Sequence, residues 1–317
     1  MRILITGGFG FVGGRMAQHM QSAGHDVVLG SRQVVAPPPI WLPDSHVVRT
    51  SWEDPTALEQ ICRDVDLLIH AAGMNAQDCS ADPVAALEFN GLNTARLVAA
   101  TKNSDIKRII YLSTAHVYSN PLDGQIDEDT CPRNPHPYAT SHIAGENAVL
   151  DVRSGVPCDR IVLRLSNIFG TPVTRDVNCW MLLANDLCRQ VVTSKKMVLR
   201  SGGVQQRDFI PMDAFVKIFD EQIINELGKS LNGVFNVGSG VSLSVLEMAL
   251  KIQKRCQITL GFEPALETRS GSTQPEQNSF LEYCTKRLAK SEATSETTIV
   301  VDAEIDGLLR FCESTFG

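Results

Sequence analysis

Three glycines near the start of the chain have the spacing of a phosphate-binding turn. Gly7, Gly10 and Gly13 follow a short apolar run, Ile3–Ile5, and open an apolar-periodic segment that continues through Met16. The run predicts a buried parallel strand and the segment predicts a helix. Glycines in such a unit allow the tight turn, and the helix N-terminus attracts a pyrophosphate, so we expect a bound dinucleotide. Its predicted contacts are Gly7, Phe9, Gly10, Phe11, Val12 and Gly13.

The end of the second predicted strand, Asp26–Gly30, indicates which dinucleotide binds. In the NAD-binding form of this unit, an acidic residue at this point holds the adenosine ribose. Here Ser31 and Arg32 follow the strand, and no acid is present. A hydroxyl and a guanidinium suit a 2′-phosphate, because arginine binds phosphate oxygens in pairs. We therefore expect NADP rather than NAD; the alternative is that Arg32 is only a solvated loop charge.

Two hydroxyls end the fourth predicted strand, Arg108–Thr114. Ligands of open α/β sheets bind beyond the carboxyl ends of the strands, so Ser113 and Thr114 are expected at the cofactor crevice. His116, two residues further on, is a possible acid or ligand contact, with an ordinary structural role as the alternative.

Strand and helix signals alternate through the first half of the chain, and they position these residues. Further strands are predicted at Asp66–His70 and Arg160–Leu165, and helices begin near Pro55, Pro83 and Tyr138. Asp54 is a plausible N-cap of the first of these helices. The alternation predicts right-handed crossovers and a doubly wound parallel sheet in an α/β fold.

The alternation becomes less regular after Gly170, which predicts a second, smaller lobe. A helix around 178–190, a strand at Met197–Arg200 and a polar stretch at 268–279 belong to it. Trp180 and Phe209 either pack on a nucleobase or lie in the core. A strand at Val234–Val237 is expected to return to the main sheet. We therefore expect a dinucleotide-binding domain at 1–170 plus about 205–240, and a substrate-binding lobe at 171–204 and 241–317.

The composition excludes several classes of protein. The 317 residues are 43% hydrophobic with a net charge of −7 and scattered basic residues, which disfavours nucleic acid as a partner. No apolar run reaches the ~18 residues of a membrane span. The start of the sequence lacks the pattern of a signal peptide, so we expect a cytoplasmic protein. Nine cysteines without a C-x-x-C pair indicate neither a disulfide framework nor a metal site.

Six motifs along the chain resemble the extended short-chain dehydrogenases/reductases that modify nucleotide sugars, the NAD-dependent epimerase/dehydratase family. The motifs are Thr6–Gly13, His70–Gly73, Leu112–Tyr118, Arg164–Gly170, Arg207–Asp213 and Phe235–Gly240. The resemblance implies a Rossmann-type sheet and a nucleotide-diphosphate-sugar substrate. It also implies a nicotinamide cofactor in contact with Ala71, Ala72, Tyr138 and His142. It also implies a homodimer joined through the helices at about 84–101 and 138–151.

The family carries a Ser/Thr–Tyr–Lys catalytic set, and this chain matches two of its three members. Thr114 matches the hydroxyl that bonds the substrate oxygen, with Ser113 as a substitute candidate, and Tyr138 matches the general acid/base. A free tyrosine titrates near ~10, so it needs cationic help near neutral pH. The family supplies a lysine four residues on, which lies on the same face of the helix. Here that residue is His142.

His142 leaves three interpretations open. In the first, it does part of the work of the lysine, bonding the nicotinamide ribose and, when protonated, lowering the pKa of Tyr138. In the second, it only positions the cofactor, while Tyr138 or a water chain delivers the proton. In the third, catalysis is lost and the chain is a silent NADP-binding or scaffold protein.

The remaining motifs point to the substrate and the reaction. Asn167 and Arg207 match family positions that contact the nucleotide sugar; the alternative for Arg207 is an ion pair with a neighbouring aspartate, Asp208 or Asp213. Ala115-His116 replaces the Asp-Glu pair that the 4,6-dehydratases carry, which disfavours dehydration. We therefore expect an NADP(H)-dependent reductase of a nucleotide-linked keto-sugar in carbohydrate biosynthesis, with hydride transfer at C4, the family's favourite position. A nucleotide-sugar epimerase that retains its NAD(P) is the alternative enzyme.

Overall fold

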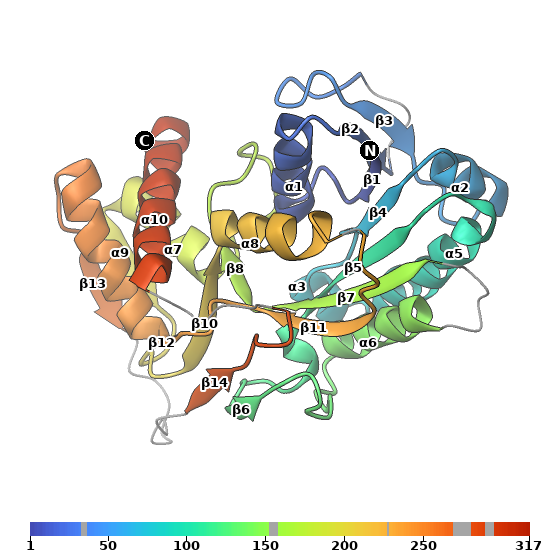
Figure 1. Cartoon of the computed structure of the whole chain (residues 1–317). Helices are drawn as coiled ribbons and strands as arrows, with labels where there is room; N and C mark the ends of the chain where they lie inside the picture. The colour runs from blue at the N-terminus through green and yellow to red at the C-terminus, as the bar shows by residue number, and fades with distance from the viewer. Residues whose placement is uncertain (33–36, 152–157, 227, 269–279, 289–294) are drawn as a thin grey trace. The chain divides into compact units, whose positions relative to one another are not determined.

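The chain forms two compact units, shown in a computed structural model (Figure 1). The structure describes residues 1–32, 37–151, 158–226, 228–268, 280–288 and 295–317. Unit 1 comprises Met1–Tyr118, Cys131–Arg164 and Ile223–Phe235; unit 2 comprises Ser119–Thr130, Leu165–Gln222 and Asn236–Gly317. The polar stretch at 269–279 lies outside the described residues.

A seven-stranded sheet with the order β11-β7-β5-β4-β1-β2-β3 forms the centre of unit 1. Its strands are β1 (Arg2–Thr6), β2 (Asp26–Ser31), β3 (His46–Arg49), β4 (Leu67–His70), β5 (Arg108–Thr114), β7 (Asp159–Leu165) and β11 (Gly233–Val237). The pairs β1–β2, β1–β4, β2–β3 and β4–β5 are parallel. This is the doubly wound order expected from the sequence, and Val234–Val237 does return to the main sheet. The short edge strand β3 was not predicted.

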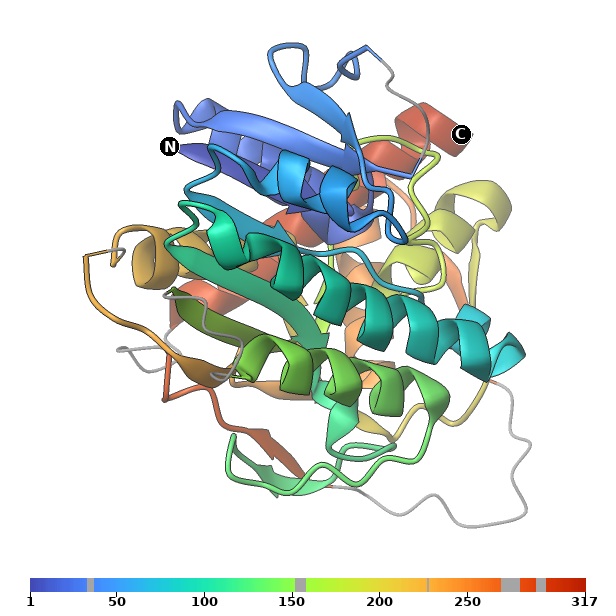
Figure 2. The same ribbon diagram turned by 90° about the vertical axis from the view of Figure 1, so that its right-hand side faces the viewer.

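Helices cover both faces of this sheet. They are α1 (Phe11–Ser22), α2 (Pro55–Cys62), α3 (Ala76–Ala81), α4 (Pro83–Ala86), η1 (Leu87–Leu92), α5 (Asn93–Ala100), η2 (Thr101–Asn103), η3 (Ala115–Val117) and α6 (Pro137–Leu150). Figure 2 shows α2, α5 and α6 side by side on one face, and α1 covers the other (Figure 1). The Asp54 carboxylate caps α2, as predicted.

The predicted helix from Pro83 is present, but its middle turn, η1, is π-helical. This turn packs closely on α6 through two glycines. A Cβ on Gly145 would lie 2.6 Å from the carbonyl oxygen of Asn90, and one on Gly91 would lie 3.0 Å from the Cβ of Ala144. Larger side chains would therefore separate η1 from the helix that carries Tyr138.

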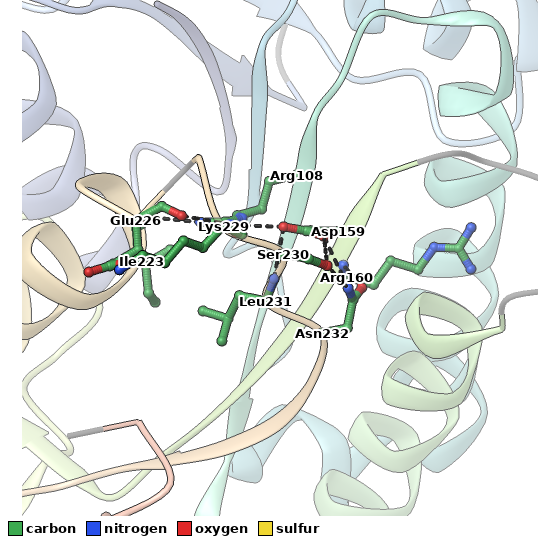
Figure 3. Close-up of polar contacts among 9 residues, drawn as sticks. All are labelled: Arg108, Asp159, Arg160, Ile223, Glu226, Lys229, Ser230, Leu231 and Asn232. Atoms are coloured by element: carbon green, nitrogen blue, oxygen red, sulfur yellow. Dashed lines mark hydrogen bonds and ion pairs between the residues drawn. The ribbon is translucent and has the colours of Figure 1, made fainter. Parts of the chain in front are cut away.

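Arg108, at the start of β5, is fully buried and binds a loop that precedes β11 (Figure 3). Its guanidinium donates to the Asp159 carboxylate at 2.7 Å, to the Ile223 carbonyl at 2.6 Å and to the Lys229 carbonyl at 2.7 Å. Asp159 in turn accepts hydrogen bonds from Ser230, Leu231 and Asn232. One buried ion pair thus attaches segment 223–232 to two strands of the sheet.

The described residues of unit 2 form three small sheets and four α-helices. The strand orders are β12-β10-β8, β13-β9 and β14-β6. The strands are β6 (Gly124–Ile126), β8 (Asn167–Phe169), β9 (Lys196–Leu199), β10 (Gln206–Pro211), β12 (Ser242–Ser244), β13 (Ala265–Thr268) and β14 (Leu281–Tyr283). The helices are α7 (Leu183–Ser194), α8 (Met212–Phe219), α9 (Val245–Leu260) and α10 (Ser295–Phe316), and a π-helical turn, η5 (Asp220–Ile224), follows α8.

Two strand pairings determine which residues unit 2 contains. Strand β6 pairs with β14, which brings 119–130 into unit 2. Strand β10 pairs with β8 and β12 and not with the seven-stranded sheet, so 206–211 also lies in unit 2.

The core of unit 2 lies where α7, α9 and α10 pack together. Its buried side chains include Leu187, Met248 and Leu308. Phe209 belongs to this core, and the ring of Trp180 stacks with Phe311 at a centroid distance of 6.2 Å. Both aromatics therefore take part in internal packing, the structural alternative in the sequence analysis.

Candidate active site

The glycine turn between β1 and α1 has the geometry of a pyrophosphate cradle. Gly7 has φ +71°, and a Cβ there would lie 2.6 Å from the backbone nitrogen of Ala72. A Cβ on Gly13 would lie 2.3 Å from the Gly7 carbonyl oxygen. No side chain caps α1, and no acidic residue lies in its first turn. The uncapped N-terminus fits the pyrophosphate of a dinucleotide, with Ala71 and Ala72 packed against the turn.

The other predicted cofactor contacts lie around this turn. Phe11 is buried and Val12 is half-buried, whereas Phe9 is 38% exposed and meets the edge of Trp41 at a centroid distance of 6.1 Å. The Ser31 carbonyl accepts hydrogen bonds from Thr50. Arg32 is exposed, its guanidinium lies 5.8 Å from the Phe89 ring centroid, and it has no carboxylate partner among the described residues.

Thr114 and Tyr138 come from neighbouring elements of unit 1. Thr114 ends β5, and its Oγ1 accepts the backbone N–H of His116 at 3.1 Å. Tyr138 is the second residue of α6, and its backbone N–H donates to Nδ1 of His136, the N-cap residue. The Thr114 hydroxyl is close enough to Tyr138 to affect its ionisation.

Tyr138 and His142, the two ionisable members of the predicted catalytic set, are both neutral near pH 7. Tyr138 is half-buried; desolvation by the surrounding protein raises its pKa to about 12, and the Thr114 hydroxyl opposes part of this rise. Burial also lowers the pKa of His142 to about 4. The two rings meet edge to face at 4.6 Å between centroids. His142 therefore gives Tyr138 no positive charge, unlike the family's lysine.

His142 is 95% buried and is held at one ring nitrogen only. Its Nδ1 lies 2.9 Å from the Tyr111 hydroxyl, whereas Nε2 has no hydrogen-bond partner among the described residues. The Nε2 edge faces Gly73, whose Cβ, if present, would lie 3.9 Å away. Tyr111 was not identified from the sequence, because it lies in the middle of a strand that is predicted to be buried throughout.

Ser113 is held by a buried ion pair, so it is not available as a substitute for Thr114. Its hydroxyl donates to Oε1 of Glu146 at 2.5 Å. Arg164 binds the same carboxylate through two nitrogens, at 3.0 and 2.6 Å. The guanidinium also covers the Tyr118 ring at 4.7 Å. Glu146 was not identified from the sequence, although a carboxylate on the apolar face of a predicted helix is a usable signal.

The predicted substrate contacts Asn167 and Arg207 lie in unit 2, on the neighbouring strands β8 and β10. Asn167 donates to the Asp208 carbonyl at 3.0 Å. Among the described side chains Arg207 binds Gln205, at 3.0 Å, and burial lowers the pKa of Arg207. Asp208 is fully buried and is occupied by the hydroxyls of Ser166 and Ser239. The described residues therefore provide no carboxylate partner for the Arg207 guanidinium.

His116 lies in η3 and takes part in positioning the loop after β5. Its carbonyl accepts a hydrogen bond from Asn134 at 2.7 Å. Within the described residues, no three histidine, cysteine or acidic side chains gather as a metal site would require. No described helix has both the length and the apolar character to cross a membrane.

Two buried histidines make unit 1 sensitive to acid. The pKa of His70 is lowered to about 3 by burial and by His142, and that of His142 lies near 4, both below the ~6.5 of an unfolded histidine. Below about pH 6.5 the unfolded chain binds protons that the folded unit does not. The free energy of unfolding therefore decreases as the pH is lowered. We expect roughly 1 kcal/mol lost per histidine and pH unit between about pH 6 and 4.

Urea unfolding measured across this pH range checks the expectation. The His142→Gln variant, which has no imidazole at this position, should show a shallower fall than the unchanged protein. Equal slopes for the two proteins would contradict it.

Comparisons with known proteins identify the family. Residues 3–238 match the NAD dependent epimerase/dehydratase family. The low-salt glycan biosynthesis protein Agl12 of Haloferax volcanii is 26% identical over 267 residues, which cover 80% of this chain and 81% of that protein. The dTDP-D-glucose 4,6-dehydratase of Bos taurus is 26% identical over 213 residues. That match covers 66% of this chain and only 55% of the dehydratase.

Solved structures share the fold. TunA, an NAD-dependent NDP-hexosamine 5,6-dehydratase, has a TM-score of 0.77 and 24% identity, and the match covers 99% of this chain and 98% of TunA. The UDP-glucuronic acid 4-epimerase from Bacillus cereus, in complex with NAD, has a TM-score of 0.78 and 20% identity over the full length of both chains. With the family match extending from the glycine turn to the end of β11, this chain belongs to the NAD dependent epimerase/dehydratase family.

Proposed function

We propose that this protein is an NADP(H)-dependent reductase that transfers a hydride to the carbonyl of a nucleotide-linked keto-sugar, with C4 as the preferred position. The feature that carries the proposal is Tyr138, a phenol that lies beside the Thr114 hydroxyl and meets the ring of the buried His142 at 4.6 Å. Its pKa of about 12 keeps the phenol protonated at neutral pH, ready to act as an acid. An epimerase must first deprotonate a sugar hydroxyl, and forming the phenolate base would cost roughly 1.4 kcal/mol for each unit between the pH and the pKa.

The residues of unit 1 have separate roles in this reaction. A bound nicotinamide would supply the hydride to the carbonyl carbon. Thr114, whose Oγ1 already accepts a backbone N–H, donates its hydroxyl hydrogen to the carbonyl oxygen. Tyr138 transfers its phenolic proton to the same oxygen, completing the alcohol, and its phenolate regains a proton from solvent. His142 is neutral and serves to position the cofactor, the second of the three interpretations above.

Arg207 is proposed to bind the diphosphate of the substrate. A half-buried guanidinium without a carboxylate partner gains a charge-assisted hydrogen bond when a phosphate binds. We expect Arg207→Ala to weaken the binding of UDP or dTDP by about 10- to 100-fold, as measured by calorimetry. The control is Arg310→Ala, which removes an exposed arginine from α10 of the same unit. Equal affinities of the Arg207 variant and the unchanged protein would refute the contact.

Arg32 is proposed to select NADP through the 2′-phosphate. The guanidinium is exposed and has no carboxylate partner among the described side chains. We expect Arg32→Ala to weaken NADPH binding by about tenfold or more while NADH binding changes little, as measured by fluorescence titration. Solved relatives contain NAD. If NADH binds this protein as tightly as NADPH, and the variant changes neither, the assignment to NADP is wrong.

The homodimer also remains a proposal. Three exposed apolar side chains on α4 and η1 support it. They are Val84, Leu87 and Leu92, which are 78%, 55% and 47% exposed. The expected contact is a bundle of this helical segment and α6 with the same helices of a second copy.

Oxidation of NADPH in the presence of UDP- and dTDP-linked 4-keto-hexoses tests the proposed function. A reductase consumes one NADPH for each sugar reduced. An epimerase, the alternative that the solved 4-epimerases of the same fold suggest, would interconvert nucleotide sugars without net oxidation. A protein that binds NADPH but changes no sugar would support the silent scaffold.

A further inference from the structure

A chain of buried polar side chains runs through unit 1 from the glycine turn to His142. Its members are Thr6, His70, Thr94, Tyr111 and His142, all at most 5% exposed. Thr6 is the residue before Gly7. Three short contacts link the side chains: Thr6–His70 at 2.6 Å, His70–Thr94 at 2.9 Å and Tyr111–His142 at 2.9 Å. The rings of His70 and Tyr111 lie 5.3 Å apart and join the two halves of the chain.

The first half of the chain has a single consistent arrangement of hydrogens. The Thr94 hydroxyl donates to the Asn90 carbonyl at 2.6 Å, so toward His70 its oxygen acts as an acceptor. His70 therefore carries its hydrogen on Nε2, and its Nδ1 accepts from the Thr6 hydroxyl. This arrangement requires a neutral His70, in agreement with its low pKa.

The same reasoning gives the tautomer of His142. Tyr111 is fully buried, and its hydroxyl lies 2.9 Å from Nδ1 of His142. Among the described residues, the other polar neighbour of this hydroxyl is Thr94, whose hydrogen is donated to Asn90 and whose oxygen already accepts from His70. If Nδ1 carried the hydrogen, the Tyr111 hydroxyl would lose the Nδ1 acceptor, which is unfavourable for a buried donor. The phenol therefore donates, Nδ1 accepts, and the hydrogen of the imidazole sits on Nε2.

We propose that Tyr111 is a positioning residue that holds His142 as the Nε2–H tautomer and directs this N–H to a hydroxyl of the bound cofactor. The Cε1–Nε2 edge of the His142 ring faces Gly73, which follows the Ala71–Ala72 segment that packs against the glycine turn. The N–H thus lies on the cofactor side of His142. The cofactor contact rests on the proposed function, whereas the tautomer is a property of the free protein.

Nitrogen NMR of protein labelled with ¹⁵N-histidine tests the tautomer directly. The chain has seven histidines, and the signals of His142 are those missing from the His142→Gln spectrum. At about pH 7 we expect a protonated Nε2 and an unprotonated Nδ1. In Tyr111→Phe, Nδ1 loses its donor, and the His142 signals should move toward those of a mixture of tautomers.

A titration with NADPH alone tests the contact, without any sugar. Tyr111→Phe should bind NADPH about three- to tenfold more weakly than the unchanged protein. The matched control is Tyr118→Phe, which removes another buried phenol from the same unit and lies against Arg164, so neither the His142 signals nor NADPH affinity should change.

Two results would overturn the tautomer assignment: a protonated Nδ1 in the unchanged protein, or His142 signals that stay the same in Tyr111→Phe. The spectrum of the unchanged protein can be measured even if the Tyr111→Phe variant does not fold. Moved signals with unchanged NADPH affinity would overturn the cofactor contact. A failure to reduce any keto-sugar would overturn the proposed function and leave the tautomer assignment intact.

Discussion

Replacing Tyr138 with phenylalanine is expected to lower kcat for keto-sugar reduction by about 10²- to 10⁴-fold. The variant keeps the ring that packs edge to face against His142 and loses only the phenolic proton. Cofactor affinity should stay within about twofold, because the lost interaction is made in the transition state. Steady-state oxidation of NADPH gives kcat, and a separate NADPH titration gives the dissociation constant.

Tyr118→Phe is the control for this experiment as well. It removes a buried phenol that lies against Arg164, so it is expected to affect stability more than turnover. If Tyr138→Phe retained the full kcat, the phenol would not be the acid. The proton would then come from a water chain, as the sequence analysis allowed.

The second large effect is expected from Arg108→Ala, which should lower the free energy of unfolding by about 3–5 kcal/mol. The substitution leaves Asp159 without its cationic partner and leaves the carbonyls of Ile223 and Lys229 without a donor (Figure 3). Segment 223–232 would lose its main attachment to β5. Urea unfolding followed by circular dichroism measures the change.

Arg63→Ala is the matched control for Arg108→Ala. Arg63 is exposed at the end of α2 in the same unit, and its removal should change the free energy by less than about 0.5 kcal/mol. A loss as small as this in Arg108→Ala would mean that the buried ion pair contributes nothing to stability. Arg108→Lys keeps the charge but not the planar guanidinium. It should lower the free energy of unfolding by an amount between those of Arg63→Ala and Arg108→Ala.

The strands and helices of unit 1 follow from local sequence signals. Apolar runs and the glycine turn predicted β1, β2, β4, β5 and β7, and Asp54 marked the start of α2. The signals were weaker where tertiary contacts decide the structure. Strand β3 is a four-residue edge strand whose side chains are at most half-buried, and its sequence lacks an alternation of apolar and polar residues. The predicted helix around 178–190 begins only at Leu183.

Strand partners could not be read from the sequence in the second half of the chain. Strand β10, with three polar and three apolar residues, was expected in the main-sheet domain, yet it pairs with β8 and β12. Likewise, the segment after Tyr118 pairs through β6 with β14, more than 150 residues away along the chain. These are long-range choices, which local propensity does not specify.

The candidate site was predictable in its residue types and less so in its protonation. The sequence predicted the proximity of Thr114 and Tyr138 and the unusual His142. It did not indicate whether His142 carries a charge, because that depends on burial among Tyr111, Tyr138 and the η1 turn. Nor did it distinguish Ser113 from Thr114: the Ser113 hydroxyl donates to Glu146, whereas the Thr114 hydroxyl accepts the His116 N–H and affects the ionisation of Tyr138.

The most direct test of the proposed function is a single-turnover reaction with NADPH that carries deuterium as the transferable hydrogen at C4 of the nicotinamide. The substrate is a UDP- or dTDP-linked 4-keto-hexose. With neutral Tyr138 as the acid, we predict one NADPH oxidised for each sugar and the deuterium on the former carbonyl carbon of the product. A nucleotide sugar that changes configuration while the NADPH keeps its deuterium, or no reaction with tightly bound NADPH, would contradict it.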